Sequence, residues 1–424
     1  MAFRWLPDPD RYAHPRLSWA IMWSADVGLR LGFRQVREVA PALDPPPGTL
    51  VVSNHLRDWD VPILATLLCR REGLRLRGVL PFSAMREDLL RRDALARLLC
   101  AWPRPLARLA GCIGLGWFFR AVRAAPMRRL REFSVDDTLQ ALHDAGLGAS
   151  DPATLFNARG RREVGAQLGS LPPRLDAIRP RRLGALQFAP WGLRRLQLSA
   201  LRMLDPAFRA TVAAQLDHFA ALLASGNSVY FAPEGAISLD GRFSRIRTGT
   251  ARLCRLDTAR AVLPCALSYD ALGPGRARVV VRVGALRHDL DPTDGRRFAA
   301  RLREAILGLY AVNPSHLIAW FLYCGPKRFT SGDFSDWLRR ASAAVAAAGF
   351  ALDPLLQRDG TPALAATRLR WLHRHRLLAR DGAHWHNRWP CDTAPGWHAP
   401  AAVVRTMACS FADTCPALAG VLCR

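Results

Sequence analysis

The feature that most constrains the fold of this chain is an alternation of short apolar runs with helical segments. The runs are rich in β-branched residues and predict strands at 49–53, 76–82, 228–231, 261–267 and 278–283. Helical or turn-rich segments separate them. This alternation is typical of α/β proteins, in which helices cover a largely parallel or mixed sheet. We therefore expect an α/β fold with a mixed sheet flanked by helices.

Three regions are expected: an N-terminal helical region over 1–44, an α/β domain over 45–292, and a mainly helical C-terminal module over 293–424. The α/β domain carries an insertion at about 146–200, where proline, glycine and arginine replace any clear periodicity. So long a connection is unusual in a compact domain. It is interpreted as a flap over a site, with disorder or peripheral packing as the simpler explanation.

Residues 15–38 predict an amphipathic helix. Its apolar side chains repeat every four residues, and its arginines gather on another face. The apolar set is Trp19, Trp23, Val27 and Leu31, and the basic set is Arg30, Arg34 and Arg37. A helix that bears tryptophan and arginine suits a membrane interface, and ordinary packing against a core explains the pattern equally well.

The C-terminal module is expected to contain helices at 296–310, 336–350 and 363–378. An Asp381-Gly382 turn follows between alternating residues, which indicates a hairpin. Helices followed by a hairpin are typical of a small winged-helix-like module. Its arginines leave open an alternative function, a nucleic-acid- or protein-binding surface. They are Arg368, Arg370, Arg374, Arg376, Arg380 and Arg388.

The composition favours an anionic partner. The chain has 424 residues, 50% of them hydrophobic, and a net charge of +25. This charge attracts polyanions such as nucleic acid, anionic lipid surfaces or phosphorylated substrates, although much of it could be a solvated face. No apolar run approaches the roughly 18–20 residues that span a bilayer. We expect a cytoplasmic protein that is peripheral at the membrane.

No metal and no cofactor are expected. The ten cysteines are scattered without a CxxC pair, which predicts reduced thiols in an intracellular protein. The cluster of His384, His386, His398 and Asp392 is more typical of surface residues than of a metal site. The glycines at 111–116 lack the strand–turn–helix context of a dinucleotide site.

Two stretches carry residues suited to chemistry. In the first, a histidine and an aspartate lie five positions apart, His55 and Asp60, directly after an apolar run. Imidazole can accept a proton from a hydroxyl, and a carboxylate can fix its tautomer. Side chains at i and i+5 of an ideal helix point about 140° apart at ~100° per residue. The two can therefore meet only if His55 lies in the turn before the helix that carries Asp60.

The second stretch is Phe231-Ala232-Pro233-Glu234-Gly235, in which an apolar strand runs into a tight loop. The loop places a carboxylate at the C-terminal end of a strand, where α/β proteins hold their sites.

Together these stretches resemble the glycerolipid acyltransferase family, whose type members are the 1-acyl-glycerol-3-phosphate (lysophosphatidic acid) acyltransferases. Asn54-His55 through Asp60 matches the Asn-His-x4-Asp block of that family, and Phe231 to Gly235 matches its Pro-Glu-Gly block. Gly116 to Arg129 is similar to the block that ends in a phosphate-contacting arginine, and Val262-Leu263-Pro264 is similar to the final proline-containing strand. The blocks fall in family order over roughly residues 45–285.

The resemblance implies direct acyl transfer without a serine or cysteine nucleophile. His55 is the expected general base and Asp60 its orienting partner. Arg129 is expected to bind a phosphate, and Glu234 with Gly235 to bind acceptor hydroxyls or order the neighbouring loop. The family usually continues with Thr-Arg-Ser, whereas Ala236-Ile237-Ser238 stands here. Substitutes for the missing phosphate-binding arginine are Arg242, Arg245 and Arg247, unless the acceptor is not a glycerol phosphate.

The expected function is an O-acyltransferase that moves a fatty acyl group from acyl-CoA or acyl-carrier protein to a hydroxyl of a lysophospholipid-like acceptor. The expected partners are an anionic membrane surface, the acyl donor and the lysolipid-like acceptor, and no nucleic acid. Two alternatives stay open: the basic C-terminal binding module, and an acyltransferase-like fold that binds lipid without turnover.

Overall fold

The computed structural model describes residues 15–38, 45–72, 75–78, 80–86, 116–127, 133–187, 191, 193–255, 261–357 and 361–423. Contacts divide the chain into two compact units. The first comprises Met1–Ser18 and Phe82–Ala221, and the second comprises Trp19–Pro81 and Leu222–Arg424. The region boundaries expected near 45 and 293 stay a prediction.

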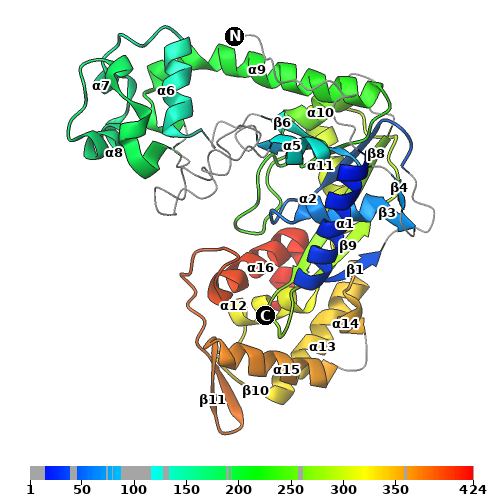
Figure 1. Cartoon of the computed structure of the whole chain (residues 1–424). Helices are drawn as coiled ribbons and strands as arrows, with labels where there is room; N and C mark the ends of the chain where they lie inside the picture. Colours follow the sequence, from blue (N-terminus) through cyan, green and yellow to red (C-terminus); the bar gives the residue numbers. More distant parts are fainter. Residues whose placement is uncertain are drawn as a thin grey trace. The chain divides into compact units, whose positions relative to one another are not determined.

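A mixed sheet forms the centre of the second unit (Figure 1). Its strand order is β1-β9-β8-β2-β7. The β8–β9 pair is antiparallel, and the β1–β9, β2–β8 and β2–β7 pairs are parallel. The strands are β1 (Arg34–Glu38), β2 (Thr49–Ser53), β7 (Val229–Phe231), β8 (Ala261–Asp270) and β9 (Arg278–Val283). The predicted α/β class with a mixed sheet is confirmed.

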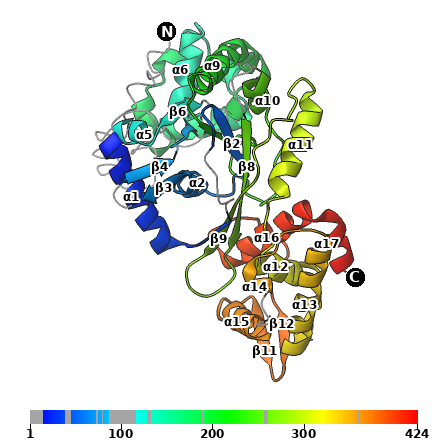
Figure 2. The same ribbon diagram turned by 90° about the vertical axis from the view of Figure 1, so that its right-hand side faces the viewer.

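Helices pack on this sheet because its central strands are apolar on both faces. Every residue of β2 and of β8 is buried, as expected of strands covered on two sides. Figure 2 shows α2 (Asp60–Leu68) and α11 (Gly295–Leu307) on opposite sides of β2 and β8. The short α10 (Thr248–Arg255) contacts α11.

The predicted N-terminal helix is shorter than expected. The helix α1 spans Pro15–Gly32, and the chain then continues as strand β1. Arg34 and Arg37 therefore lie on a strand, and the prediction of one helix through residue 38 is wrong. Gly32 weakens helix continuation, and parallel pairing of β1 with β9 satisfies the backbone groups that the helix would have used.

The single strand expected at 76–82 is also wrong. Strand β4 (Arg75–Gly78) pairs in antiparallel fashion with β3 (Cys69–Glu72), and β5 (Phe82–Arg86) begins after Pro81. Proline lacks the N–H that a continuous ladder requires, so a break at this position is expected. In the first unit, β5 pairs in parallel with β6 (Ala124–Met127).

The region at 146–200 folds into helices with a core of their own. Buried side chains of this core include Phe156, Val164, Leu175 and Trp191. Asn157 caps its longest helix, accepting from the N–H groups of Arg159 and Gly160. The region is thus ordered and internally packed. The helices described in the first unit are α5 (Gly116–Ala121), α6 (Val135–Asp144), α7 (Pro152–Leu155), α8 (Ala158–Leu168), the 3-10 turns η4 (Leu175–Ala177), η5 (Pro180–Gln187) and η6 (Leu193–Arg195), and α9 (Leu198–Ala224), which continues into the second unit.

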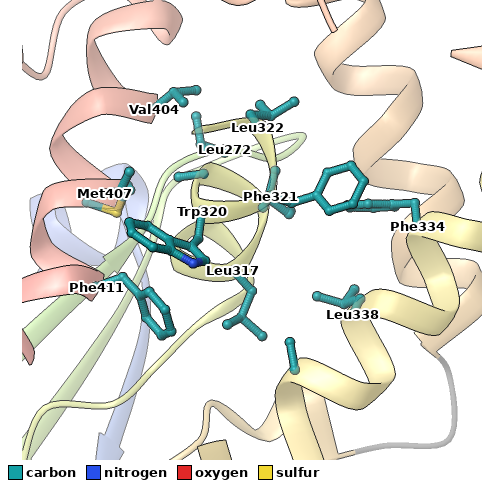
Figure 3. Close-up of a cluster of buried hydrophobic side chains, with 14 of the residues drawn as sticks. Leu272, Leu317, Trp320, Phe321, Leu322, Phe334, Leu338, Val404, Met407 and Phe411 are labelled. Carbon is teal, nitrogen blue, oxygen red and sulfur yellow. The ribbon is translucent and has the colours of Figure 1, made fainter. Parts of the chain in front are cut away.

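The C-terminal part of the second unit combines helices with a small sheet of order β10-β12-β11. The predicted hairpin is present, with Gly382 at a φ of 55° in its turn. An apolar helix missed in the sequence, α12, packs against α16 and α13 through aromatic and aliphatic side chains (Figure 3). The elements are α12 (Pro314–Cys324), β10 (Arg328–Thr330), α13 (Ser331–Ala347), α14 (Pro354–Gln357), α15 (Thr361–Arg374), β11 (Leu378–Asp381), β12 (His384–Asn387), α16 (Pro400–Thr414) and α17 (Pro416–Leu422).

None of the helices in the described part of the chain is long and apolar enough to cross a membrane.

Candidate active site

The site is built on the loop that leaves strand β2. Asn54 fixes the start of this loop to strand β8 by two hydrogen bonds with Leu267: the side-chain amide donates to the backbone carbonyl, and the backbone N–H donates to the side-chain oxygen, both at 2.8 Å. Ser53 is buried beneath it, with its hydroxyl 3.0 Å from that of Tyr230. These contacts hold the backbone from which the next residue, His55, projects.

His55 and Asp60 meet under the condition that their spacing set. Helix α2 begins at Asp60, so His55 lies in the turn before it. The Nδ1 atom of His55 is 3.1 Å from Asp60 Oδ2. The same oxygen accepts the backbone N–H groups of Leu56 at 2.6 Å and Arg57 at 2.8 Å. The loop therefore closes around this carboxylate oxygen, which holds the His55 ring and the backbone of the two residues that follow it.

Tyr269 completes the pairing from strand β8. Its hydroxyl donates to Asp60 Oδ1 at 2.5 Å, across 209 residues of sequence. Burial and the nearby Asp60 charge raise the pKa of Tyr269 well above its ordinary value, so the phenol stays a neutral donor. Both oxygens of the Asp60 carboxylate are thus occupied, and Asp60 itself is fully buried. Tyr269 was not predicted as part of the site, because it lies beyond the apolar run at 261–267 and between the polar residues Ser268 and Asp270.

Glu234 joins the His55 loop to a second loop. One carboxylate oxygen accepts the backbone N–H of His55 at 2.9 Å, and the other accepts the backbone N–H of Ser244 at 2.6 Å. Glu234 is 1% exposed. Burial raises the pKa of this carboxyl to about 7, against the opposing effect of the two N–H donors. The residue therefore acts on the site by holding the position of His55.

The raised pKa of Glu234 predicts a pH-dependent stability. Since its folded pKa of about 7 exceeds the ordinary value of 4.5, the folded state binds an extra proton between these values. The free energy of unfolding should therefore fall as pH rises from 4.5 to 7. We expect Glu234→Gln to flatten this profile in chemical denaturation, whereas Glu304→Gln, at an exposed position, should keep it. Parallel profiles of wild type and Glu234→Gln would contradict the assignment.

The residues after Glu234 shape the same loop. Gly235 has a φ of 70°, a left-handed conformation in which other residues are strained. Ser238 donates its backbone N–H to the carbonyl of His55 at 2.8 Å. Arg247 binds the loop backbone, with its Nε 3.3 Å from the carbonyl of Glu234 and its N–H bonded to the carbonyl of Pro233 at 2.8 Å. Arg247 thus supports the Pro-Glu-Gly turn.

The other arginines predicted to bind substrate are not part of this hydrogen-bonded group. Arg242 and Arg245 lie exposed on the loop that follows Gly235. In the described part of the structure, neither guanidinium forms a hydrogen bond or ion pair, so both remain able to contact a ligand. Arg129 lies outside the described residues. The structure thus brings together His55, Asp60 and Glu234.

The arrangement is suited to taking a proton from a hydroxyl. A carboxylate accepts hydrogen bonds, so the His55 nitrogen facing Asp60 is the donor and Nε2 is the basic nitrogen. No hydrogen bond within the described residues occupies Nε2. In those residues, no group of three or more histidine, cysteine or acidic side chains could hold a metal ion.

Comparison with known proteins returns no family model that matches this chain and no curated protein that matches it at a significant level. A functional conclusion therefore depends on the geometry around His55.

Proposed function

We propose that the protein is an O-acyltransferase that transfers a fatty acyl group from a thioester to an acceptor hydroxyl. The observation that carries the proposal is the pairing of His55 Nδ1 with Asp60 at 3.1 Å, with Tyr269 bonded to the other carboxylate oxygen. Such a pair gives the imidazole a fixed tautomer and a stabilised protonated form. The order of sequence blocks around it, which resembles that of glycerolipid acyltransferases, supports the same chemistry.

The reaction uses His55 as base and then as acid. Its Nε2 accepts the proton of the acceptor hydroxyl while that oxygen attacks the thioester carbonyl carbon. The C–S bond then breaks, and the departing thiolate takes the proton from the imidazolium. An ester and a free thiol are formed, so no external oxidant or reductant is needed. Asp60 stabilises the transient imidazolium.

The proposed acceptor is a lysophospholipid-like molecule at a membrane surface. Apolar side chains in the second unit are exposed on α1 and on the His55 loop: Trp23 at 41%, Leu31 at 69% and Trp59 at 53%. Tryptophan side chains favour the membrane–water interface, and exposed Arg30 and Arg34 flank them. The net charge of +25 adds attraction to anionic lipid. These features support a peripheral location at a membrane surface.

The rival function is the binding of nucleic-acid phosphates by the C-terminal arginines. One of these arginines, Arg368, is not available for it. Arg368 is buried and forms an ion pair with Asp270 at 2.5 Å, so its charge is satisfied inside the protein. The other five arginines of that set are exposed. They do not account for the hydrogen-bonded arrangement around His55, and for this reason the acyltransferase function is preferred.

The deciding experiment measures release of free thiol from a long-chain acyl-CoA with a panel of lysophospholipid acceptors. We expect His55→Ala to reduce kcat by about 100- to 10,000-fold, the range of general base catalysis. The backbone N–H of His55 still reaches Glu234 in this variant, so the loop should keep its position.

His375→Ala is the matched control, since His375 is exposed on the segment after α15. It should leave thiol release unchanged. Equal rates for wild type and His55→Ala, or no acceptor-dependent release by the wild type with any acceptor, would refute the proposed function.

A further inference from the structure

Arg57, two residues after His55, lies between two aromatic rings. Its guanidinium carbon is 4.2 Å from the ring centre of Trp397 and 5.0 Å from that of Tyr269. Tyr269 is the residue whose hydroxyl bonds Asp60, and the two rings contact each other at 5.8 Å. Arg57 therefore belongs to the same group of side chains as the His55–Asp60 pair.

Among the residues that the structure describes, Arg57 has no ion-pair partner to neutralise its charge. Within the described residues no carboxylate binds its guanidinium, and its Nε is buried without a hydrogen-bond partner. Asp60 is close in sequence, but its oxygens are occupied by His55, two backbone N–H groups and Tyr269. Burial also lowers the pKa of Arg57 from its ordinary value. The terminal guanidinium nitrogens of Arg57 thus remain available as donors for an anion.

The C-terminal segment that supplies Trp397 is anchored. The backbone N–H of Gly396 donates to the Thr406 hydroxyl of α16 at 2.8 Å, and that hydroxyl lies 3.1 Å from the Gly396 carbonyl. Trp397 packs against both the core under β2 and β8 and the core of the C-terminal helices. The ring is therefore held in place, and it limits the orientations of the Arg57 side chain.

We propose that Arg57 binds a phosphate group of one substrate during acyl transfer. The inference rests on the proposed function and names the anion-binding residue of the same site. Guanidinium binds phosphate through paired N–H donors, and stacking on aromatic rings pre-orients it. The loop after Gly235 has Ala236-Ile237-Ser238 and no arginine until Arg242. Arg57 supplies a positive charge next to His55 instead.

The test combines two donors with two acceptors. The donors are an acyl-CoA, which carries phosphates, and the corresponding acyl-N-acetylcysteamine thioester, which does not. The acceptors are lysophosphatidic acid and monoacylglycerol, which differ by the phosphate. We expect Arg57→Gln to raise KM by about 10- to 100-fold, as for loss of a charged hydrogen bond, only for the phosphate-bearing form of one substrate. The substrate affected identifies the source of the phosphate.

Arg57→Lys keeps the charge without the planar fork, and we expect it to recover part of the lost affinity. Arg370→Gln, which changes an exposed arginine of α15, is the matched control and should behave as wild type. An equal loss of kcat/KM for all four substrate pairs would show that Arg57 only maintains the loop and would overturn the proposal. No change for any pair would overturn it as well.

Calorimetric titration with inorganic pyrophosphate separates this proposal from the proposed function. Binding by the wild type that is weakened at least tenfold in Arg57→Gln supports the anion site, even if no thiol release is found. Absence of binding by the wild type, or equal binding by both proteins, contradicts it. Thermal unfolding of the two proteins in the same buffer must first show that the variant is folded.

Discussion

Asp60→Asn is expected to lower kcat for thiol release by about 1,000-fold, within the range seen when a base loses its orienting carboxylate. Asp60 Oδ2 accepts hydrogen bonds from His55 Nδ1 and from the N–H groups of Leu56 and Arg57, and Oδ1 accepts from Tyr269. An amide offers one oxygen and an NH2 group in place of two acceptors. It cannot satisfy all four donors, and it cannot stabilise an imidazolium by charge. The loss should therefore appear mainly in kcat.

The control for Asp60→Asn is Asp58→Asn, the same substitution at an exposed position in the same loop. It should retain the wild-type rate. Because Asp60 is buried, thermal unfolding must accompany the kinetic measurement, and the comparison holds for protein that is folded at the assay temperature. A folded Asp60→Asn variant with the wild-type kcat would rule out the orienting role of Asp60.

Arg368→Ala is expected to lower the free energy of unfolding by about 3 to 5 kcal/mol, as for removal of one member of a buried ion pair. The side chains of Arg368 and Asp270 are only 7% and 2% exposed, and their charged atoms are 2.5 Å apart. The substitution leaves the Asp270 carboxylate buried with the Ser315 hydroxyl as its remaining side-chain donor. The pair connects α15 to the end of β8, next to Tyr269, so the loss should affect the whole unit.

Arg370→Ala is the matched control for this stability prediction, because Arg370 lies exposed on the same helix. Its effect should stay within about 0.5 kcal/mol, as for most surface substitutions. Both variants are compared with wild type by urea or guanidinium denaturation at neutral pH. A change for Arg368→Ala no larger than that of the control would mean that the buried pair does not stabilise the fold.

Local patterns predicted most of the strands around the site. The β2, β7, β8 and β9 strands were found because short β-branched runs between turn signals are visible in the sequence. The helix α12 was missed, since its apolar residues surround the helix and leave no amphipathic period. The end of α1 was misjudged because pairing with β9 is a contact between distant segments, which helix periodicity does not encode.

The candidate site likewise contains residues that a local pattern predicts and residues that only contacts between distant segments bring in. The meeting of His55 and Asp60 was predicted on the condition that His55 lies in the turn before a helix, and the structure fulfils that condition. The partners that immobilise the pair come from elsewhere in the chain: Glu234 lies 179 residues from His55, and Tyr269 lies 209 residues from Asp60. No short motif predicts which distant side chain will reach a given atom.

The amino-acid sequence alone was sufficient to predict the α/β class, the strands β2, β7, β8 and β9, and the two residues proposed to handle the proton. These depend on periodicity and spacing, which are local properties. The contacts of Tyr269 and Glu234 with the pair, and the buried ion pair of Arg368, became visible in the folded structure alone. It also placed the Arg57 guanidinium over two aromatic rings, without an ion-pair partner among the described residues. Those outcomes depend on which segments the packed core brings together, and hence on burial and charge compensation across the whole chain.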